Sequence, residues 1–260
     1  MKTWLLRQKQ TNHWATTKAT ADACYALLLN GTNWLNTEKE VTIQLGEYTI
    51  AGKEQGKEAG SGYFKHTIPA SKVLPQMGNM NVDFSKKNAA TASPSWGAVH
   101  WQYFEDLDKI TSSATPLSIS KKLFIEKNTA TGKELNPVND GDAITVGDKV
   151  KIRIEIRVDR PMEYVHLKDM RASSMEPVIV LSSYKWQDGL GYYESTRDAS
   201  TNFFISYLPK GTYVFEYPVN IALTGNYSVG IASAQCMYAP EFNSHSEGIR
   251  INVVARSDSK

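Results

Sequence analysis

The chain has 260 residues, of which 41% are apolar and 22% charged, values typical of a globular protein of one or two domains. Its 29 basic side chains nearly balance the 27 acidic ones, which leaves a net charge of +2. This balance, with no Lys/Arg run, gives no electrostatic reason to expect a nucleic acid or a membrane surface as partner. Arg7 follows Leu5 and Leu6 at once, so neither a transmembrane segment nor a signal peptide is predicted.

Residues 1–30 are predicted to be helical. No Gly or Pro occurs in residues 16–29, and apolar side chains recur at helical spacing on one face: Ala21, Cys24, Tyr25 and Leu28. Thr16 or Thr17 is a suitable N-cap, Gly31 is a suitable C-cap, and residues 1–10 fit the end of a preceding helix. Two helices cannot bury such stripes alone. We therefore expect a helical remnant whose stripe packs on a β domain or on a second chain.

The middle of the chain changes to a period of two. Residues 41–45 alternate and stop at Gly46, and further strands are predicted at residues 63–68, 80–84 and 96–104. Polar, small-residue loops are predicted at residues 51–62 and 86–95. Residues 106–115 have the composition of a linker, which places a domain boundary near residue 112.

The second half shows the clearest strands. Val150, Ile152, Ile154, Ile156 and Val158 alternate with charged residues, as in a strand with one buried face. The same alternation recurs at residues 213–219, 227–231 and 249–253, each time after or between turn signals. The predicted fold is therefore mainly β, with antiparallel β-sandwich domains and a short helical stub at the N-terminus.

Cys24 and Cys236 are the only cysteines, and they form no C-x-x-C pair. We predict two buried thiols that pack as small apolar groups. A disulfide between them stays open, because sequence alone does not determine it.

Catalytic motifs are missing from the sequence. There is no G-x-S-x-G, P-loop, G-x-G-x-x-G or H-E-x-x-H, and the five histidines (13, 66, 100, 166 and 245) lack ligand spacing. Asn139 to Asp142 resembles a calcium loop but lacks its bidentate Glu, so we interpret it as a turn. Glu105, Asp106 and Asp108 could perform acid/base work, although solvated acids also belong in such a loop. We predict no enzyme activity, no cofactor and no metal.

Aromatic residues are the one suggestive enrichment, with 6 Trp, 13 Tyr and 8 Phe. Exposed aromatic side chains bind sugars, so a carbohydrate-binding or adhesion β-sandwich is the alternative hypothesis. Tyr213, Phe215 and Tyr217 instead fall on the alternating inward face, where a role in the core is the better interpretation.

Three segments, taken in order, resemble the C-terminal end of bacterial alpha-2-macroglobulins of the Bacteroidetes type. Residues 14–29 are similar to the last helices of the family's thioester-bearing domain, and residues 94–104 to the stretch that leaves its host β domain. Residues 203–217, 237–242 and 167–177 are similar to the terminal macroglobulin-like domain. The resemblance implies a helical remnant at 1–32, part of a small β domain at 33–112, and a C-terminal macroglobulin-like sandwich at 113–260.

The family traps proteases: cleavage of a bait region triggers a rearrangement, and a Cys–Gln thioester then acylates the protease. That chemistry needs a C-x-E-Q motif, which this sequence lacks, since Cys24 precedes Tyr-Ala-Leu and Cys236 precedes Met-Tyr-Ala. The resemblance therefore implies a non-catalytic piece of a protease inhibitor. It also implies contact with the thioester domain, and a periplasmic or cell-envelope location with any export signal or lipid anchor upstream.

In the family, an aromatic residue near the Tyr-Ala-Pro-Glu segment can shield the thioester from water. The matching residue is Tyr238, with Met237 beside it. Excluding water would protect a reactive acyl group from hydrolysis. The alternative is that Tyr238 is a strand-end residue that packs near Pro240.

Overall fold

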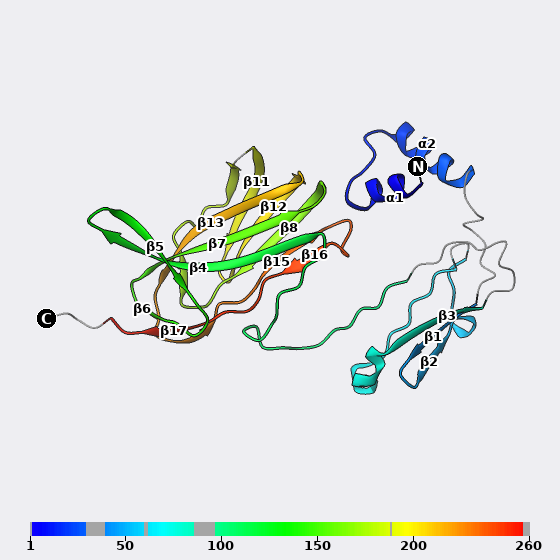
Figure 1. Cartoon of the computed structure of the whole chain (residues 1–260), viewed down its shortest axis with the longest axis horizontal. Helices are drawn as coiled ribbons and strands as arrows, with labels where there is room; N and C mark the ends of the chain where they lie inside the picture. The colour runs from blue at the N-terminus through cyan, green and yellow to red at the C-terminus, as the bar shows by residue number, and fades with distance from the viewer. Residues whose placement is uncertain (1, 30–39, 60–61, 86–96, 188, 257–260) are drawn as a thin grey trace. The chain divides into compact units, whose positions relative to one another are not determined.

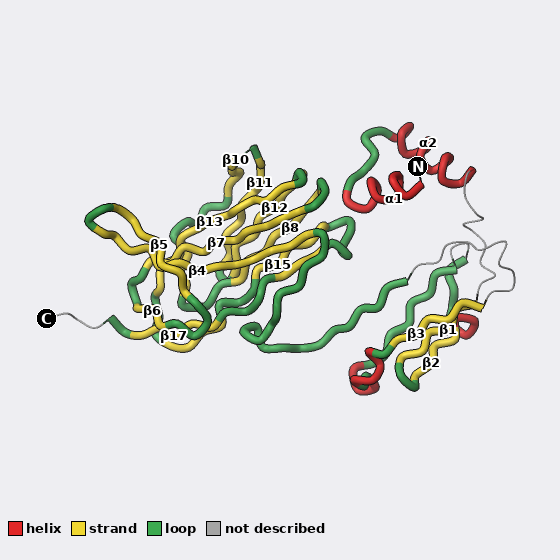
Figure 2. The backbone as a smooth tube through the Cα atoms, in the orientation of Figure 1, coloured by secondary structure: helices red, strands yellow, loops and turns green. Residues whose placement is uncertain are grey.

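The computed structural model describes residues 2–29, 40–59, 62–85, 97–187 and 189–256. Two compact units are present: Met1–Trp14 together with Gln102–Lys260, and Ala15–Trp101. Most of the regular structure consists of strands, as Figure 2 shows, so the predicted mainly β fold is confirmed. Gly31 and the loop at 86–95, which were predicted as a cap and a loop, lie outside the described residues.

In its described residues, the unit Ala15–Trp101 contains one α-helix and one small antiparallel sheet of order β2-β1-β3. Its core consists of the buried residues Leu45, Ile50 and Met77, with Ile43, Tyr48, Phe64 and Ile68 packed against them. Gly46 makes the β1–β2 turn at a φ of +58°, a conformation that costs little only for glycine. The elements are α2 (Thr17–Leu29), β1 (Glu40–Leu45), β2 (Tyr48–Ala51), β3 (Met80–Ser85) and the 3₁₀ turns η1 (Gly52–Glu54), η2 (Ala70–Lys72) and η3 (Pro75–Gly78).

The other unit is a β-sandwich preceded by helix α1 (Lys2–Thr11), as labelled in Figure 1. Its six-stranded sheet has the order β10-β11-β12-β8-β15-β16, and its five-stranded sheet the order β5-β4-β7-β13-β9. A third sheet, β14-β17-β6, pairs β17 and β6 in parallel. The strands are β4 (Leu117–Thr129), β5 (Gly132–Val138), β6 (Ala143–Thr145), β7 (Lys149–Val158), β8 (Met162–Met170), β9 (Met175–Pro177), β10 (Ser183–Gln187), β11 (Leu190–Arg197), β12 (Ser200–Leu208), β13 (Gly211–Ile221), β14 (Gly225–Ser228), β15 (Ala232–Cys236), β16 (Asn243–His245) and β17 (Arg250–Val254).

The sandwich core follows the alternation predicted from the sequence. All five predicted inward residues of β7 are buried, and so are Phe215, Tyr217 and Val219 on β13. The rings of Tyr192, Phe203, Phe215 and Tyr217 pack together in this core, with centroids 5.0–6.3 Å apart. Such aromatic packing adds to the free energy gained by burying apolar surface.

The helices confirm part of the N-terminal prediction and correct another part. Thr16 caps α2, because its Oγ1 accepts a hydrogen bond from the Ala19 amide at 3.0 Å. Its apolar stripe was expected to pack on a β domain or on a second chain, and in this single chain it packs on no β domain. The second-chain alternative stays a prediction. Ala23 is the buried residue of α2, whereas Ala21, Cys24, Tyr25 and Leu28 are exposed. The prediction that both cysteines are buried was also wrong: both are free thiols, Cys236 buried and Cys24 exposed.

Two predicted strands do not form in the described residues. The segment 63–68 contributes Phe64 and Ile68 to the small core, but it joins no ladder. The described part of the segment 96–104, residues 97–104, is also irregular. Both segments have β-prone side chains, yet a strand needs a partner for its backbone groups, and this does not follow from local composition.

The segment before β4 lies antiparallel to the stretch that contains β16, although most of it is not assigned as strand. Asp108 pairs with Arg250 at 2.8 Å, and the Gly248 amide donates to the Ile110 carbonyl at 2.8 Å. Ser113 and His245 exchange two backbone hydrogen bonds of 3.0 Å, and Thr115 Oγ1 donates to the Asn243 carbonyl at 3.0 Å. A Cβ at Gly248 would lie 2.0 Å from the Leu107 carbonyl oxygen, so the close approach requires glycine.

Among the described residues, neither helix has the length and apolar character needed to cross a bilayer.

Candidate functional site

Met237 and Tyr238, the two residues singled out from the sequence, follow directly after β15 at one end of the six-stranded sheet. Tyr238 is 80% exposed, and its ring meets the ring of Tyr164 edge-on, with centroids 5.1 Å apart. The Met237 amide donates to the Tyr164 carbonyl at 2.9 Å, which fixes the backbone of both residues. Tyr238 is therefore a surface aromatic held by a neighbouring ring, and it is not packed into the core.

Tyr164 is the one described non-glycine residue with a positive φ, at 54°. A bulky side chain rarely adopts this left-handed conformation, which stores about 1–3 kcal/mol of strain. The ladder between β8 and β12 pairs Val165 with Ile205 and Glu163 with Tyr207, and it is interrupted at Tyr164 itself. Such strain persists only where the surrounding structure holds it. In this conformation the Tyr164 ring meets the ring of Tyr238.

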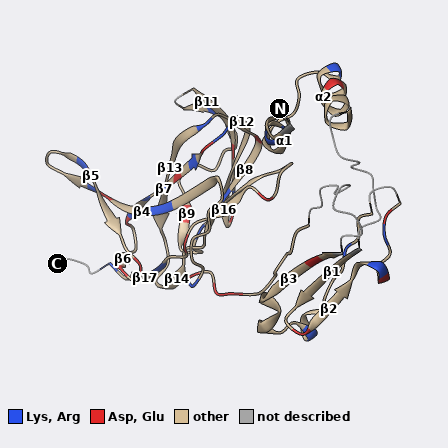
Figure 3. Cartoon of the chain, turned by 45° about the vertical axis from the view of Figure 1, so that its right-hand side comes forward, with Lys and Arg blue, Asp and Glu red and all other residues tan. Residues whose placement is uncertain are grey.

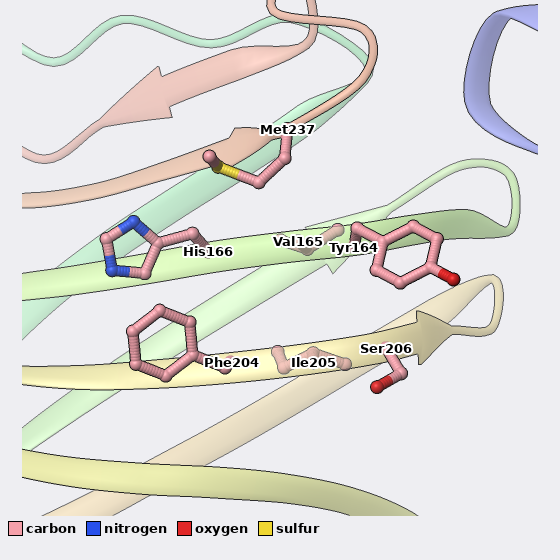
Figure 4. Close-up of a pocket in the computed structure, with 7 residues that line it drawn as sticks. All are labelled: Tyr164, Val165, His166, Phe204, Ile205, Ser206 and Met237. Atoms are coloured by element: carbon pink, nitrogen blue, oxygen red, sulfur yellow. The ribbon is translucent and has the colours of Figure 1, made fainter.

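A small open pocket of about 140 Å³ lies beside these residues on the outer face of the sheet. His166 and Phe204 stack across β8 and β12 with centroids 4.7 Å apart and planes inclined by 6°. His166 Nε2 lies 3.0 Å from Asn202 Oδ1, which orients the imidazole. Figure 4 shows this stacked pair beneath Met237, with Tyr164 farther along β8; the lining residues are Tyr164, Val165, His166, Phe204, Ile205, Ser206 and Met237.

The stacked pair belongs to a longer row across the outer face. The register places Tyr184 opposite Tyr193, Tyr193 opposite Phe204, and Phe204 opposite His166. We call these four residues the aromatic row. Cross-strand partners share a face of the sheet, and Phe203 faces the core, so the row faces outward. The row cannot be found from the sequence by itself, because it depends on the pairing of four separate strands.

The segment after α1 binds the same end of the sandwich. Thr11 Oγ1 donates to the Pro161 carbonyl at 2.9 Å, and Thr11 is buried as a result. The His13 amide donates to Glu163 Oε2 at 3.1 Å, and His13 Nδ1 lies 2.5 Å from the same oxygen. Glu163 directly precedes Tyr164. The end of the first helix is therefore attached one residue away from the strained tyrosine.

Cys236 lies next to Met237 but is not a reactive group. Its thiol donates to the Glu163 carbonyl at 3.2 Å, and burial raises the pKa of this thiol above its ordinary value. A thiol with a raised pKa is a poor nucleophile, because the thiolate is the reactive form.

The other residues considered from the sequence have structural contacts. Asp106 pairs with Lys109, and the Arg250 guanidinium holds the pKa of Asp108 below its usual value. In the turn at 139–142, Asp142 Oδ2 accepts from the Asn139 amide at 2.7 Å, and Asp140 Oδ1 accepts from the Arg250 amide at 2.7 Å. No group of three or more metal-ligating side chains occurs among the described residues. Basic and acidic residues are interspersed along the strands of the sandwich (Figure 3).

Comparisons with known proteins were made by family, by sequence and by structure. The search of curated proteins by sequence found no match. Among solved structures, Escherichia coli alpha-2-macroglobulin activated by porcine elastase is similar with a TM-score of 0.46 at 12% identity, over 95% of this chain and 21% of that one. The trypsin-activated E. coli protein has a TM-score of 0.42 at 12% identity, over 97% and 18%. Salmonella alpha-2-macroglobulin reacted with methylamine has a TM-score of 0.42 at 12% identity, over 93% and 15%.

This chain spans between 13% and 24% of the length of the first alpha-2-macroglobulin chains that it resembles. The family comparison is more specific. Residues 117–241, which run from β4 to just beyond Tyr238, match the model described as Bacterial Alpha-2-macroglobulin MG10 domain. This match covers most of the two large sheets of the sandwich and includes the aromatic row, Tyr164 and Met237. Over residues 117–241, the β-sandwich of this chain is therefore similar to the bacterial alpha-2-macroglobulin MG10 domain.

Proposed function

We propose that this chain is the non-catalytic C-terminal region of an alpha-2-macroglobulin-like protease inhibitor. The observation that carries the proposal is the MG10 match over residues 117–241. In this proposal residues 1–32 are the end of the thioester-bearing helical domain, residues 33–112 belong to a small β domain, and residues 113–260 form the terminal domain. Proteases would be partners of the intact protein, in the periplasm or cell envelope.

Within that protein, Tyr238 and Met237 would shield the thioester from water. Tyr238 is exposed and oriented by the strained Tyr164, which suits a side chain that covers a group on another domain. The attachment of residues 11–13 beside Tyr164 supports the proposal, because the end of the helical domain would then lie close to the shield. The shield would act by excluding water from a reactive acyl group.

The first test is the sequence of the intact protein. We expect a C-x-E-Q motif in a helical domain that precedes residue 1. If the intact protein lacks this motif, the protease-trap proposal is wrong.

The second test measures hydrolysis of the thioester in the intact protein as the appearance of a new thiol. Tyr238→Ala is expected to speed hydrolysis about tenfold, the effect of losing about 1.4 kcal/mol of protection, whereas Tyr238→Phe keeps the slow rate. Tyr184→Ala is the matched control, since Tyr184 is equally exposed but lies on the edge strand β10. Cys24 adds the same thiol background to every variant. Equal hydrolysis rates for Tyr238→Ala and wild type would contradict the shield.

The alternative function is glycan binding, and one observation favours it. Tyr184 and Trp186 alternate on the edge strand β10 and are 77% and 79% exposed. Tyr184 meets Tyr193 at 63°, so these two rings do not form a flat platform, and the alternative depends on Tyr184 and Trp186. A glycan array distinguishes the two functions. Binding that is lost in Trp186→Ala supports the alternative, and a blank array contradicts it.

A further inference from the structure

Two charged residues occupy inward positions in the core of the sandwich. Lys121 lies on β4 between the buried residues Ile119 and Leu123, and Asp169 lies on β8 after the buried Leu167. Both side chains are completely inaccessible to solvent. The two strands belong to different sheets, so this pair spans the interior of the sandwich. Burying two charges costs several kcal/mol per ion, and replacing such a pair with apolar residues is often neutral or stabilising.

The contacts around the pair hold both reacting groups in place. Lys121 Nζ lies 2.8 Å from Asp169 Oδ1. Lys121 Nζ also donates to the Met170 carbonyl at 2.6 Å, and the Val229 and Gly230 carbonyls lie 3.4 Å away. The other carboxylate oxygen, Oδ2, accepts a hydrogen bond from the Tyr217 hydroxyl. The amine therefore contacts one oxygen of the carboxylate, while the tyrosine hydroxyl holds the other.

We propose that Lys121 and Asp169 condense to an intramolecular isopeptide bond that joins β4 to β8 and so links the two sheets covalently. The proposal does not depend on the proposed function, because it concerns only residues inside the sandwich. It assigns a covalent modification to a site where the geometry already brings the two reacting groups into contact.

The reaction balances without any other reactant. A proton passes from the Lys121 ammonium group to Asp169 Oδ1, which leaves a neutral amine and a carboxylic acid. The amine lone pair attacks Cγ, and the negative charge that develops on Oδ2 is stabilised by the Tyr217 hydroxyl. The nitrogen loses a second proton to Oδ1, the Cγ–Oδ1 bond breaks, and Oδ1 leaves as water. The product is an amide, whose carbonyl oxygen is Oδ2 and whose N–H can donate to the Met170 carbonyl.

The surroundings favour both the reaction and its product. Burial lowers the pKa of Lys121 more than Asp169 raises it, and the Arg171 guanidinium also lowers it, so the neutral amine is easier to reach than in water. Arg171 itself is occupied by Thr201 Oγ1 at 2.6 Å and by the Asp198 carbonyl at 3.2 Å. Attacking and attacked groups are already in contact, which removes most of the entropic cost of bringing them together. A core that excludes water also protects the amide from hydrolysis.

The test is the intact mass of the purified wild-type chain after complete denaturation. We expect a mass lower than that of the sequence by one water molecule, and a proteolytic digest with a branched peptide that joins Lys121 to Asp169. A wild-type mass equal to that of the full sequence overturns the proposal, and no variant has to fold for this result.

Variants locate the bond and identify the role of Tyr217. Lys122→Ala changes the neighbouring exposed residue and is expected to keep the loss of water, whereas Lys121→Ala abolishes it. Asp169→Asn is expected to release ammonia in place of water, a difference that the mass resolves. Tyr217→Phe is expected to lower the cross-linked fraction at a given time after refolding. A loss of water that persists in Lys121→Ala would assign the modification to other residues and overturn the proposal.

Discussion

The sandwich and the small sheet of the other unit use the same alternation of apolar and polar residues but bury very different cores. Among the described residues, 33 buried apolar residues form the sandwich core, whereas three form the core of the small sheet. The small sheet also has only three strands, and it depends on turn residues and on Phe64 and Ile68 from an irregular segment. The large core includes buried polar residues such as Lys121 and Asp169, whereas the small core is made of apolar residues. With so few buried residues, the stability of the small sheet depends more strongly on each turn.

The largest loss of stability is expected from a substitution at the centre of the sandwich core. Phe203→Ala removes a fully buried ring that packs against Tyr192, Phe215 and Tyr217. We expect it to lower the free energy of unfolding of the sandwich by about 3–5 kcal/mol, measured by urea denaturation. Phe204→Ala is the matched control, because the next residue points outward and is 47% exposed. Similar losses from the two variants would show that the outer face is as important to folding as the core.

A smaller effect is expected in the small sheet, at Gly46. An alanine there would have to keep a φ of +58°, and its Cβ would lie 2.8 Å from the Gln76 carbonyl oxygen. The strained conformation alone costs about 1–2 kcal/mol. With so few buried residues, we expect amide hydrogen exchange of β1 and β2 to accelerate while that of β7 is unchanged. Gly132→Ala, at a turn with open space around it, is the comparison for a positive φ without a clash.

The third prediction concerns the pH dependence of stability, which involves the buried residues Lys121, Asp169 and Tyr217 of the sandwich core. Burial and Asp169 hold the pKa of Tyr217 well above its ordinary value. The unfolded chain therefore loses the Tyr217 proton near pH 10, while the folded chain retains it. The contribution of Tyr217 to the free energy of unfolding is thus fully present below pH 10 and is lost as the pH rises above it. At pH 11 the loss from this residue is about 1.4 kcal/mol.

Tyr217→Phe should remove this part of the alkaline decline, measured by urea denaturation at pH 9 and pH 11. The comparison uses molecules without the isopeptide bond, in which Lys121 and Asp169 keep their ionisable groups. In these molecules the lowered pKa of Lys121 acts in the opposite direction in both the wild type and the variant. Tyr184→Phe, which changes an exposed tyrosine, is the control and should decline like the wild type. The same decline in Tyr217→Phe would contradict the assignment.

The smallest change in stability is expected when an exposed ion pair is removed from the surface. Lys109→Ala removes an ion pair with Asp106 in which both side chains are about two-thirds exposed. Such pairs contribute little, because water and salt screen them. We expect no measurable change in the denaturation midpoint. A clear shift would mean that the residues before β4 are part of the cooperative unit of the sandwich.

The sequence predicted the sandwich more fully than the site. The alternation in β7 and β13 identifies inward residues directly, because the period of a strand is local. Cross-strand pairing is not local, which is why residues 63–68 and 96–104 were predicted as strands but do not form them. For the same reason the aromatic row could not be predicted.

Two further signals in the sequence could have been used. Lys121 interrupts the apolar positions of β4, and Asp169 those of β8, so each charge stands where the pattern requires a buried residue. Such interruptions mark buried polar groups that need partners. Tyr238 and Met237 were identified through the family resemblance, and the strained Tyr164 beside them has no signature in the sequence.

The pairing of residues 108–115 with residues 243–250 has a mechanical consequence. Force applied to the chain ahead of Asp108 would open these contacts one after another, starting at Arg250, before it reached the ladder between β4 and β7. Sequential opening needs far less force than shearing a whole ladder. The eight residues freed in this way have a contour length of about 26–29 Å. The segment would detach reversibly under tension, while the sandwich stays folded.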